Sequence, residues 1–415
     1  MLSSSESIRK SDSIYLAWFV CTMFFFYQYM LRALPNILSQ EIFTTFKVTA
    51  EEFSTLGSIY LMTYGILQIP IGFLLDRVSL RKISFGAILL CIGSAILFSV
   101  SNDFYMMQVS RFFLACGSAA ALGITLKLIS ANCIGMTRSV LSGITLTVGV
   151  LGPILGGKIV QYVLSKHEWQ IASIMIGFSG FILFIASFVF VKNVSQQNVF
   201  SIKEIIAQFK NVFSSKVLIY SIIAGGIYIP PCVLADLWGT RFLSAKFSIS
   251  EGSAIDISLS LYYGLAVGSL ILPYCSEKIK NLDLIIILSL LCNTGLLCTL
   301  LFISELSIEN LYFLLMMIGF FCGAEMICFN AAWRIVPSNC TALTVGVINS
   351  FSLIFIAIFQ QVIGILMDSM WNGELTETGL RIYSKDDYIL GISAIPAVLF
   401  ACFAISLLLK KTNKG

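Results

Sequence analysis

Twelve apolar runs, each long enough to cross a lipid bilayer as a helix, constrain this chain more than any other feature. An α-helix needs about 20 mostly apolar residues to span the hydrocarbon core. The runs lie at residues 14–38, 53–75, 83–100, 105–130, 139–163 and 170–191, and again at 216–239, 254–274, 282–303, 310–335, 341–367 and 387–409. Their polarity does not alternate along the chain, which excludes the strands of a β-barrel. We therefore expect an all-α integral membrane protein of twelve transmembrane helices embedded in the lipid bilayer.

Composition excludes other classes of protein. Only 12% of the residues are charged and 58% are hydrophobic, so a soluble domain of this size would expose large apolar patches. The net charge of +4 is no argument for nucleic acid binding. The cysteines are scattered through apolar runs and His167 is the single histidine, so neither a metal site nor a cofactor is expected. The polar start of the chain and its long first apolar run do not resemble a cleavable signal peptide.

One polar stretch divides the runs into two groups of six. It predicts an N-terminal six-helix bundle at residues 1–191, a cytoplasmic linker at 192–215 and a C-terminal six-helix bundle at 216–415. Lysines and arginines gather in the loops that share a side with the N-terminus, and most loop acids lie on the opposite side. By the positive-inside rule, both termini are predicted to be cytoplasmic.

The loop after the second run carries the most specific motif. Residues 72–82 read Gly-Phe-Leu-Leu-Asp-Arg-Val-Ser-Leu-Arg-Lys, with Asp76, Arg77 and Arg81 in the positions of an acid and its flanking cations. This loop resembles the signature loop of the major facilitator superfamily, although Ser79 and Leu80 depart from it. A degenerate copy follows the eighth run at residues 268–280, as expected of two pseudo-symmetric halves. The resemblance implies the major facilitator fold, alternating access, and a gating role for Asp76, Arg77 and Arg81.

The fifth run is rich in glycine and contains Gly152 and Pro153. It resembles the glycine-proline motif of drug–proton antiporters, which motivates export of a drug or siderophore as an alternative function. Small residues also let helices approach closely, and proline permits a bend. We favour this packing interpretation and assign Gly152 and Pro153 a conformational role.

Three further stretches narrow the resemblance. They are residues 26–35, residues 228–243, and residues 346–368. Together they resemble the bacterial phagosomal nutrient-transporter family, whose members import amino acids and in some cases nucleosides. The resemblance implies a location in the bacterial inner (cytoplasmic) membrane. Relatives tend to carry a glutamate where this chain has Arg334, a departure that bears on the coupling chemistry.

Ionisable residues within spans are costly and are functional candidates for that reason. Arg32 in the first run and Arg111 in the fourth suit a carboxylate ligand, because arginine stays charged and donates paired hydrogen bonds. Each could instead pair structurally, and for Arg111 we favour a structural or gating part. Asp236, at the end of the seventh run, is expected at the membrane interface.

Glu325 lies midway along the tenth run, where a carboxyl group is costly to ionise. This suits proton coupling or binding of an ammonium group, whereas a structural ion pair is the alternative. By the resemblance, the first, fourth, seventh and tenth spans line a central cavity. The polar residues proposed to complete a substrate site beside Arg32 are Tyr27, Gln28, Tyr64, Tyr228, Asn330, Asn349 and Gln360.

The sequence therefore predicts that the protein is a secondary active transporter rather than an enzyme. We expect proton-coupled uptake of a small polar metabolite, an amino acid before a nucleoside, with the proton gradient as energy source and the protein acting as a monomer. Export of a drug or siderophore is the first alternative. A membrane sensor or membrane enzyme is the second, and neither a soluble domain nor a cluster of catalytic residues supports it.

Overall fold

The computed structural model describes residues 4–133, 135–191, 212–337 and 340–412. These residues form helices, with one isolated antiparallel bridge between Leu375 and Arg381. Twelve helical spans are long and apolar enough to cross a membrane, from Ile14–Ile37 to Lys385–Leu408. The predicted all-α membrane fold is confirmed.

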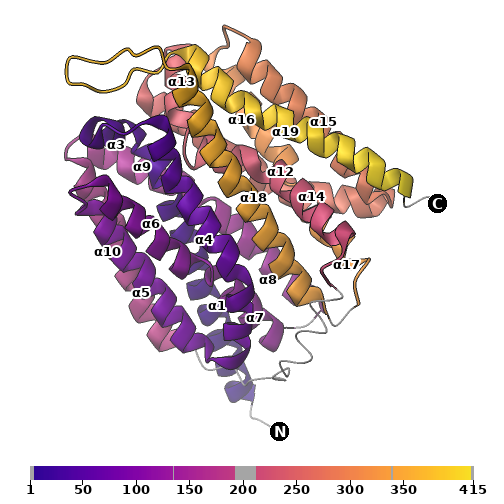
Figure 1. The fold of residues 1–415 in the computed structure, drawn as a ribbon. Helices are drawn as coiled ribbons and strands as arrows, with labels where there is room; N and C mark the ends of the chain where they lie inside the picture. The colour runs from indigo at the N-terminus through magenta and orange to yellow at the C-terminus, as the bar shows by residue number, and fades with distance from the viewer. Residues whose placement is uncertain (1–3, 134, 192–211, 338–339, 413–415) are drawn as a thin grey trace.

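The two groups of helices occupy different sides of the molecule (Figure 1). The first group consists of α1 (Ser4–Arg32), α2 (Leu34–Ile37), α3 (Ser39–Phe46), α4 (Ala50–Arg77), α5 (Leu80–Ser99), α6 (Phe104–Ser118), α7 (Ala121–Asn132), α8 (Gly135–Val150), α9 (Gly152–Leu164) and α10 (Trp169–Phe190). The second consists of α12 (Ser215–Pro230), the π-helix η1 (Pro231–Ala235), α13 (Gly239–Phe247), α14 (Glu251–Ile279), α15 (Leu282–Phe302), α16 (Ile308–Cys322), α17 (Glu325–Trp333), α18 (Thr341–Met370) and α19 (Lys385–Thr412). We call these groups the first and second halves.

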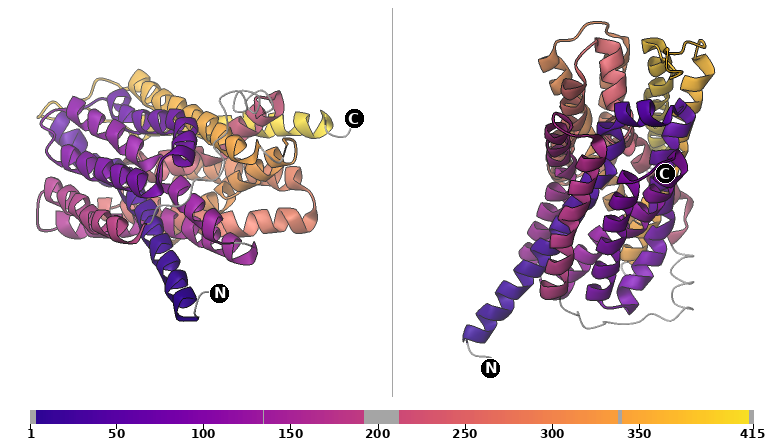
Figure 2. Two further views of the ribbon diagram at one scale, coloured as in Figure 1. Left: turned by 90° about the horizontal axis from the view of Figure 1, so that it is seen from below. Right: turned by 90° about the vertical axis from the view of Figure 1, so that its left-hand side faces the viewer.

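The halves meet mainly where α4 packs along α18, and α14 of the second half also packs on α8 and α9. Hydrogen bonds between halves concentrate at the end formed by α2, α3, α13 and residues 371–384, away from both termini (Figures 1 and 2). We call this the closed end and the opposite one the termini end. Towards the termini end, Asn349 Nδ2 donates to Gln68 Oε1 at 3.4 Å.

Five spans, the first, fourth, fifth, seventh and tenth, are interrupted, and the fifth breaks at Leu151, between α8 and α9. The first breaks at Ala33, just before Pro35, and the seventh changes from α- to π-helix at Pro230 and Pro231. Proline has no N–H to donate, so an α-helix cannot continue regularly through it. The fourth span breaks between α6 and α7, and the tenth between α16 and α17. In a membrane protein, backbone that leaves the helical pattern at membrane depth is tolerated where it is buried in protein or lines a cavity, so these breaks are candidate positions for polar groups.

Within the second half, α14 and α16 approach so closely that their backbones touch. Two pairs of glycines four residues apart allow this approach: Gly264 and Gly268 lie on α14, whereas Gly319 lies on α16 and Gly323 directly follows its end. A Cβ atom at Gly264 would lie 1.8 Å from the carbonyl oxygen of Met316, and one at Gly319 would meet α14 just as closely. This reciprocal pairing of small residues joins the two helices by backbone packing.

Replacing Gly268 with leucine should therefore destabilise the fold. A Cβ atom at this position would lie 1.9 Å from the Phe320 carbonyl oxygen, so the helices must separate. Overpacking costs about 1–3 kcal/mol, and we expect a clearly lower melting temperature in detergent. Gly295→Leu is the matched control, because no atom lies within 4 Å of a Cβ there. Equal melting temperatures for the two variants would contradict this packing account.

Candidate functional site

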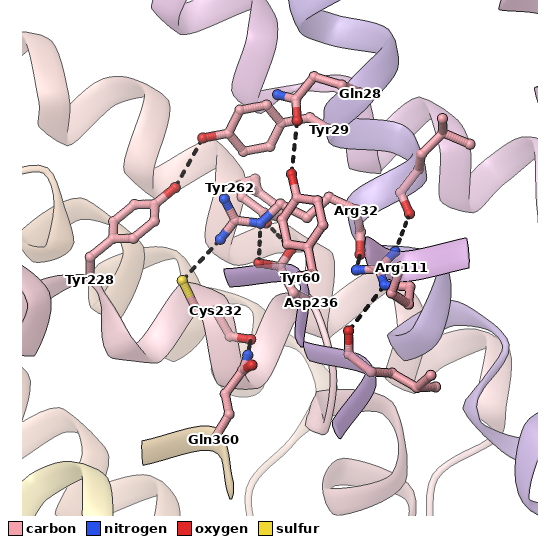
Figure 3. Close-up of polar contacts among 12 residues, drawn as sticks. Gln28, Tyr29, Arg32, Tyr60, Arg111, Tyr228, Cys232, Asp236, Tyr262 and Gln360 are labelled. Carbon is pink, nitrogen blue, oxygen red and sulfur yellow. Dashed lines mark hydrogen bonds and ion pairs between the residues drawn. The ribbon is translucent and has the colours of Figure 1, made fainter. Parts of the chain in front are cut away.

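A buried ion pair joins the halves at the broken ends of the first and seventh spans. Arg32 ends α1, and its Nε donates to Asp236 Oδ2 at 2.6 Å (Figure 3). Asp236 follows η1, whose π-type hydrogen bond from the Asp236 N–H to the Pro231 carbonyl turns the chain towards α1. Both side chains are less than a tenth exposed. The seventh span ends at Ala235, and the π-turn at its end buries Asp236 between the two halves.

Tyrosine rings surround this ion pair. The Arg32 guanidinium lies 5.2 Å from the ring centre of Tyr29, 5.9 Å from that of Tyr60 and 5.7 Å from that of Tyr228. The hydroxyls of Tyr29 and Tyr228 are 3.1 Å apart, across the two halves. Tyr262 donates its hydroxyl to Asp236 (Figure 3). Aromatic faces stabilise a cation, and these hydrogen bonds satisfy polar groups that burial would otherwise penalise.

Cys232 and Gln360 extend the cluster towards α18. The Arg32 Nη2 donates to Cys232 Sγ at 2.9 Å, and the Gln360 amide nitrogen donates to the Cys232 carbonyl at 2.7 Å. Gln360 Oε1 is buried, and no hydrogen-bond partner for it is found among the described residues. Gln360 therefore brings an unused acceptor to the cluster.

Arg111 supports Arg32 from behind. Its guanidinium donates to the carbonyl oxygens of Leu31 and Arg32 at 3.0 Å each, and to that of Leu56 at 3.1 Å. The last carbonyls of a helix lack partners within it, so Arg111 caps the end of α1 and ties it to α4. This geometry assigns Arg111 a positioning contact, and all of these bonds lie in the first half.

Glu325 begins α17 at the break in the tenth span and is 8% exposed. Among the described residues, no hydrogen-bond or ion-pair partner is found for its carboxylate. Asp236, by contrast, accepts from both Arg32 and Tyr262. Of the two acids near the centre, Glu325 is the one with free capacity.

The other predicted substrate residues divide into two sets. Gln28 accepts a hydrogen bond from Tyr60, and Tyr64 lies beside Tyr60 with ring centres 5.9 Å apart, so both adjoin the cluster. Tyr27 donates to the carbonyl of Gly177 on α10 and is directed into the first half, away from Arg32. The remaining predicted residues are Asn349, which bonds to Gln68 nearer the termini end, and Asn330, half-buried in α17.

Sequence reasoning missed Tyr29, Tyr60, Tyr262 and Cys232 as members of this cluster. A signal was available for Tyr29, which lies three residues before Arg32 and so shares its helix face. None was available for Tyr262, because only the fold brings the middle of α14 to the end of η1.

Apart from Arg111, the predicted gating residues lie away from the cluster. Asp76 and Arg77 end α4; the Asp76 side chain lies outside the described part of the structure, and Arg77 is exposed. Arg81 Nε donates to the Val191 carbonyl at 2.7 Å, joining the start of α5 to the end of α10. Gly152 and Pro153 begin α9, where a Cβ atom on Gly152 would lie 2.3 Å from the Phe26 carbonyl oxygen. The glycine-rich fifth span thus packs on α1, in agreement with the packing interpretation.

A separate cavity of about 430 Å³ lies at the closed end, between α3, α13 and residues 376–388. Arg241, Arg381 and Glu251 contribute charges to its lining. Burial, together with the negative charge of Glu251, raises the pKa of nearby Glu41 to about 7. None of the residues predicted to bind substrate lines this cavity.

Comparison with known proteins decides the family. The model of the Major Facilitator Superfamily matches residues 18–360. The chain belongs to this superfamily. It is thus a multi-pass membrane transporter, as the loop at residues 72–82 indicates.

Members with solved structures share this superfamily fold across the chain. A bacterial homolog of the human lysosomal transporter Spinster, in an inward-facing and unoccupied conformation, gives a TM-score of 0.79 at 14% identity, over 96% of this chain and 97% of its own. The nucleoside transporter NupG gives 0.72 at 13% identity, over 94% and 99%. The uncharacterized transporter YybO of Bacillus subtilis (strain 168) is 20% identical over 179 residues, which cover 42% of this chain and 41% of that protein. The match therefore spans about two fifths of that curated relative, and these likenesses establish the fold alone.

Arg32→Ala should destabilise this transporter strongly. Removing one partner of a buried ion pair leaves the other charge uncompensated, at a cost of about 3–5 kcal/mol. Lys158→Ala is the matched control, because Lys158 pairs with Asp256 across the same two halves but is 59% exposed. An exposed pair contributes at most about 1 kcal/mol. Melting temperatures in detergent would test this, and similar losses in the two variants would contradict the burial argument.

Proposed function

We propose that this superfamily member takes up a small polar metabolite by alternating access, driven by protons, and that the cluster around Arg32 and Asp236 binds the substrate. The observation that supports the proposal most is the position of this ion pair, between the two halves and at the breaks of the first and seventh spans. A ligand bound there touches both halves. Its binding energy can therefore favour one arrangement of the halves over the other.

A zwitterion such as an amino acid matches the charges of the cluster. Its carboxylate would take the place of Asp236 on the Arg32 guanidinium, with paired hydrogen bonds. Its ammonium group would bind the carboxylate of Asp236 or Glu325. When the ammonium group takes Asp236, no charge of the ion pair is left without a partner, which is the condition for opening a buried ion pair at low cost.

A nucleoside is the second candidate, and the tyrosines favour it. Tyr29, Tyr60 and Tyr228 present ring faces and hydroxyls at one site. Base–aromatic stacking and hydroxyl contacts would suit a nucleobase with its ribose. The fold of this chain is similar to that of the nucleoside transporter NupG, which is consistent with a nucleoside as substrate.

Glu325 is our candidate for proton coupling. A carboxylate without a partner at membrane depth gains stability when it takes up a proton, since the neutral form is cheaper to bury. Its place at the start of α17, where a helix N-terminus favours the ionised form, would let both protonation states be reached.

We further propose that the closed end faces outward, with both termini in the cytoplasm of a bacterial cell and the protein in its inner (cytoplasmic) membrane. The distribution of lysine and arginine supports this orientation. In this orientation the conformation described here is closed to the outside. A monomer is sufficient for the mechanism, because the cluster is formed within one chain.

Uptake into proteoliposomes tests the proposal. Labelled amino acids and nucleosides are supplied outside under an inwardly directed proton gradient, and we expect one class to accumulate only while the gradient lasts. Absence of uptake for every amino acid and nucleoside would overturn the import proposal. Accumulation without a proton gradient would contradict proton coupling, although the substrate class would still be identified.

Glu325→Gln should abolish proton-driven accumulation and leave substrate exchange across the membrane at least partly intact. Glutamine keeps the size of the side chain but cannot release a proton. Glu309→Gln is the matched control, since Glu309 lies exposed in the first turn of α16. Counterflow and gradient-driven uptake are measured side by side. If proton-driven uptake is retained in Glu325→Gln, the role of Glu325 is structural and it does not couple transport to protons.

A further inference from the structure

The carboxylate of Asp368 makes a second connection between the halves, at the closed end. Asp368 lies near the end of α18, in the second half, and α4 of the first half begins at Ala50. Its Oδ2 accepts from the Glu51 N–H at 2.8 Å and its Oδ1 from the Ala50 N–H at 3.3 Å. We propose that Asp368 is a conformational latch that holds this end closed by capping α4 across the interface.

The chemistry of the contact suits an anion. The first N–H groups of a helix have no acceptor within it, and the helix dipole makes this end partially positive. Thr49 already caps the N–H of Glu52 through its side chain. Asp368 takes two of the remaining donors, Ala50 and Glu51. Both halves therefore complete the capping of α4 only while they are together.

A short hairpin strap holds Asp368 from its other side. Residues 371–384 fold back through the bridge of Leu375 with Arg381, and the turn uses Gly379 at a φ of +79°. Arg381 Nη1 donates to Asp368 Oδ1 at 3.0 Å, and the Tyr383 hydroxyl also donates to it. The same Tyr383 oxygen accepts from the Ala50 N–H at 2.8 Å. The strap thus supplies the Arg381 guanidinium and the Tyr383 hydroxyl to the Asp368 carboxylate. Through Tyr383 it also contacts the first residue of α4.

The surroundings of this contact must separate together with it. A Cβ atom on Gly364, one turn before Asp368, would lie 2.6 Å from the Ala50 carbonyl oxygen. Gln361 accepts from the Ser58 hydroxyl at 3.2 Å and donates to the Glu51 carbonyl at 3.3 Å. The end of α18 therefore cannot leave α4 gradually, and loss of the Asp368 contact releases several bonds at once.

Exposure distinguishes this latch from the buried ion pair. The Asp368 and Arg381 side chains are 16% and 30% exposed, against 7% and 6% for Asp236 and Arg32. Water can replace the partners of Asp368 when the halves part, so the contact can break reversibly at modest cost. Its place at the closed end makes it a conformational control that is independent of cargo and of transport direction.

Hydrogen exchange followed by mass spectrometry tests the latch on the otherwise unaltered chain in nanodiscs. In Asp368→Ala, amides of residues 50–58 should exchange at least about tenfold faster than in the wild type, because charged hydrogen bonds are lost and opening is favoured. If the equilibrium shifts between two conformations, residues 64–77 at the termini end of α4 should exchange more slowly. General destabilisation would instead speed exchange at both ends.

Two further variants keep the test decisive. Tyr383→Phe removes one hydroxyl, keeps the ring, and should give a smaller change of the same sign at residues 50–58. Asp256→Asn removes the exposed ion pair of Asp256 with Lys158, which also joins the two halves, and should leave residues 50–58 unchanged. Unchanged exchange at residues 50–58 in Asp368→Ala would overturn the latch, as would equal acceleration at both ends of α4. None of these readouts requires the substrate, so failure of the proposed uptake would not affect them.

Discussion

The ion pair of Arg32 with Asp236 is the interaction on which the rest of the structure depends. Two charges are buried between the two halves, so each needs a partner to offset the cost of its burial. The neighbouring groups follow from this need. Tyr262 bonds to Asp236, three tyrosine rings face Arg32, and Arg111 fixes the backbone that carries Arg32. We propose that a charged ligand can replace part of this cluster.

Helix interruptions make this arrangement possible. A continuous helix would direct its backbone N–H and carbonyl groups along its own axis and leave none for other partners. The break at Ala33 frees the carbonyls of Leu31 and Arg32 for Arg111. The π-turn at Pro231 brings Asp236 inward and leaves the Cys232 carbonyl to Gln360. Backbone groups at a helix end also bind across the halves at the closed end, where the Glu51 N–H in the first turn of α4 donates to the Asp368 carboxylate.

Much of the fold could be predicted from the sequence, because hydropathy and charge act locally. The twelve spans follow from run length, and residues 72–82 indicate the superfamily that the family model then matches. The site is harder, because its partners are 204 residues apart in the case of Arg32 and Asp236. Hydropathy does not reveal the π-turn at residues 231–235, and so it could not show that Asp236 is buried against Arg32. Tyr27 was grouped with Arg32, but five residues along a helix place it on another face, towards α10.

A double-mutant cycle on Arg32→Ala and Asp236→Ala tests the central claim most directly. The free energy of unfolding is compared for the wild type, the two single variants and the double variant in the same detergent. If the two charges hold each other across the halves, the double variant is more stable than the sum of the single losses predicts, with a coupling energy of about 1.5 kcal/mol or more. Losses that add to within about 0.5 kcal/mol would contradict the account.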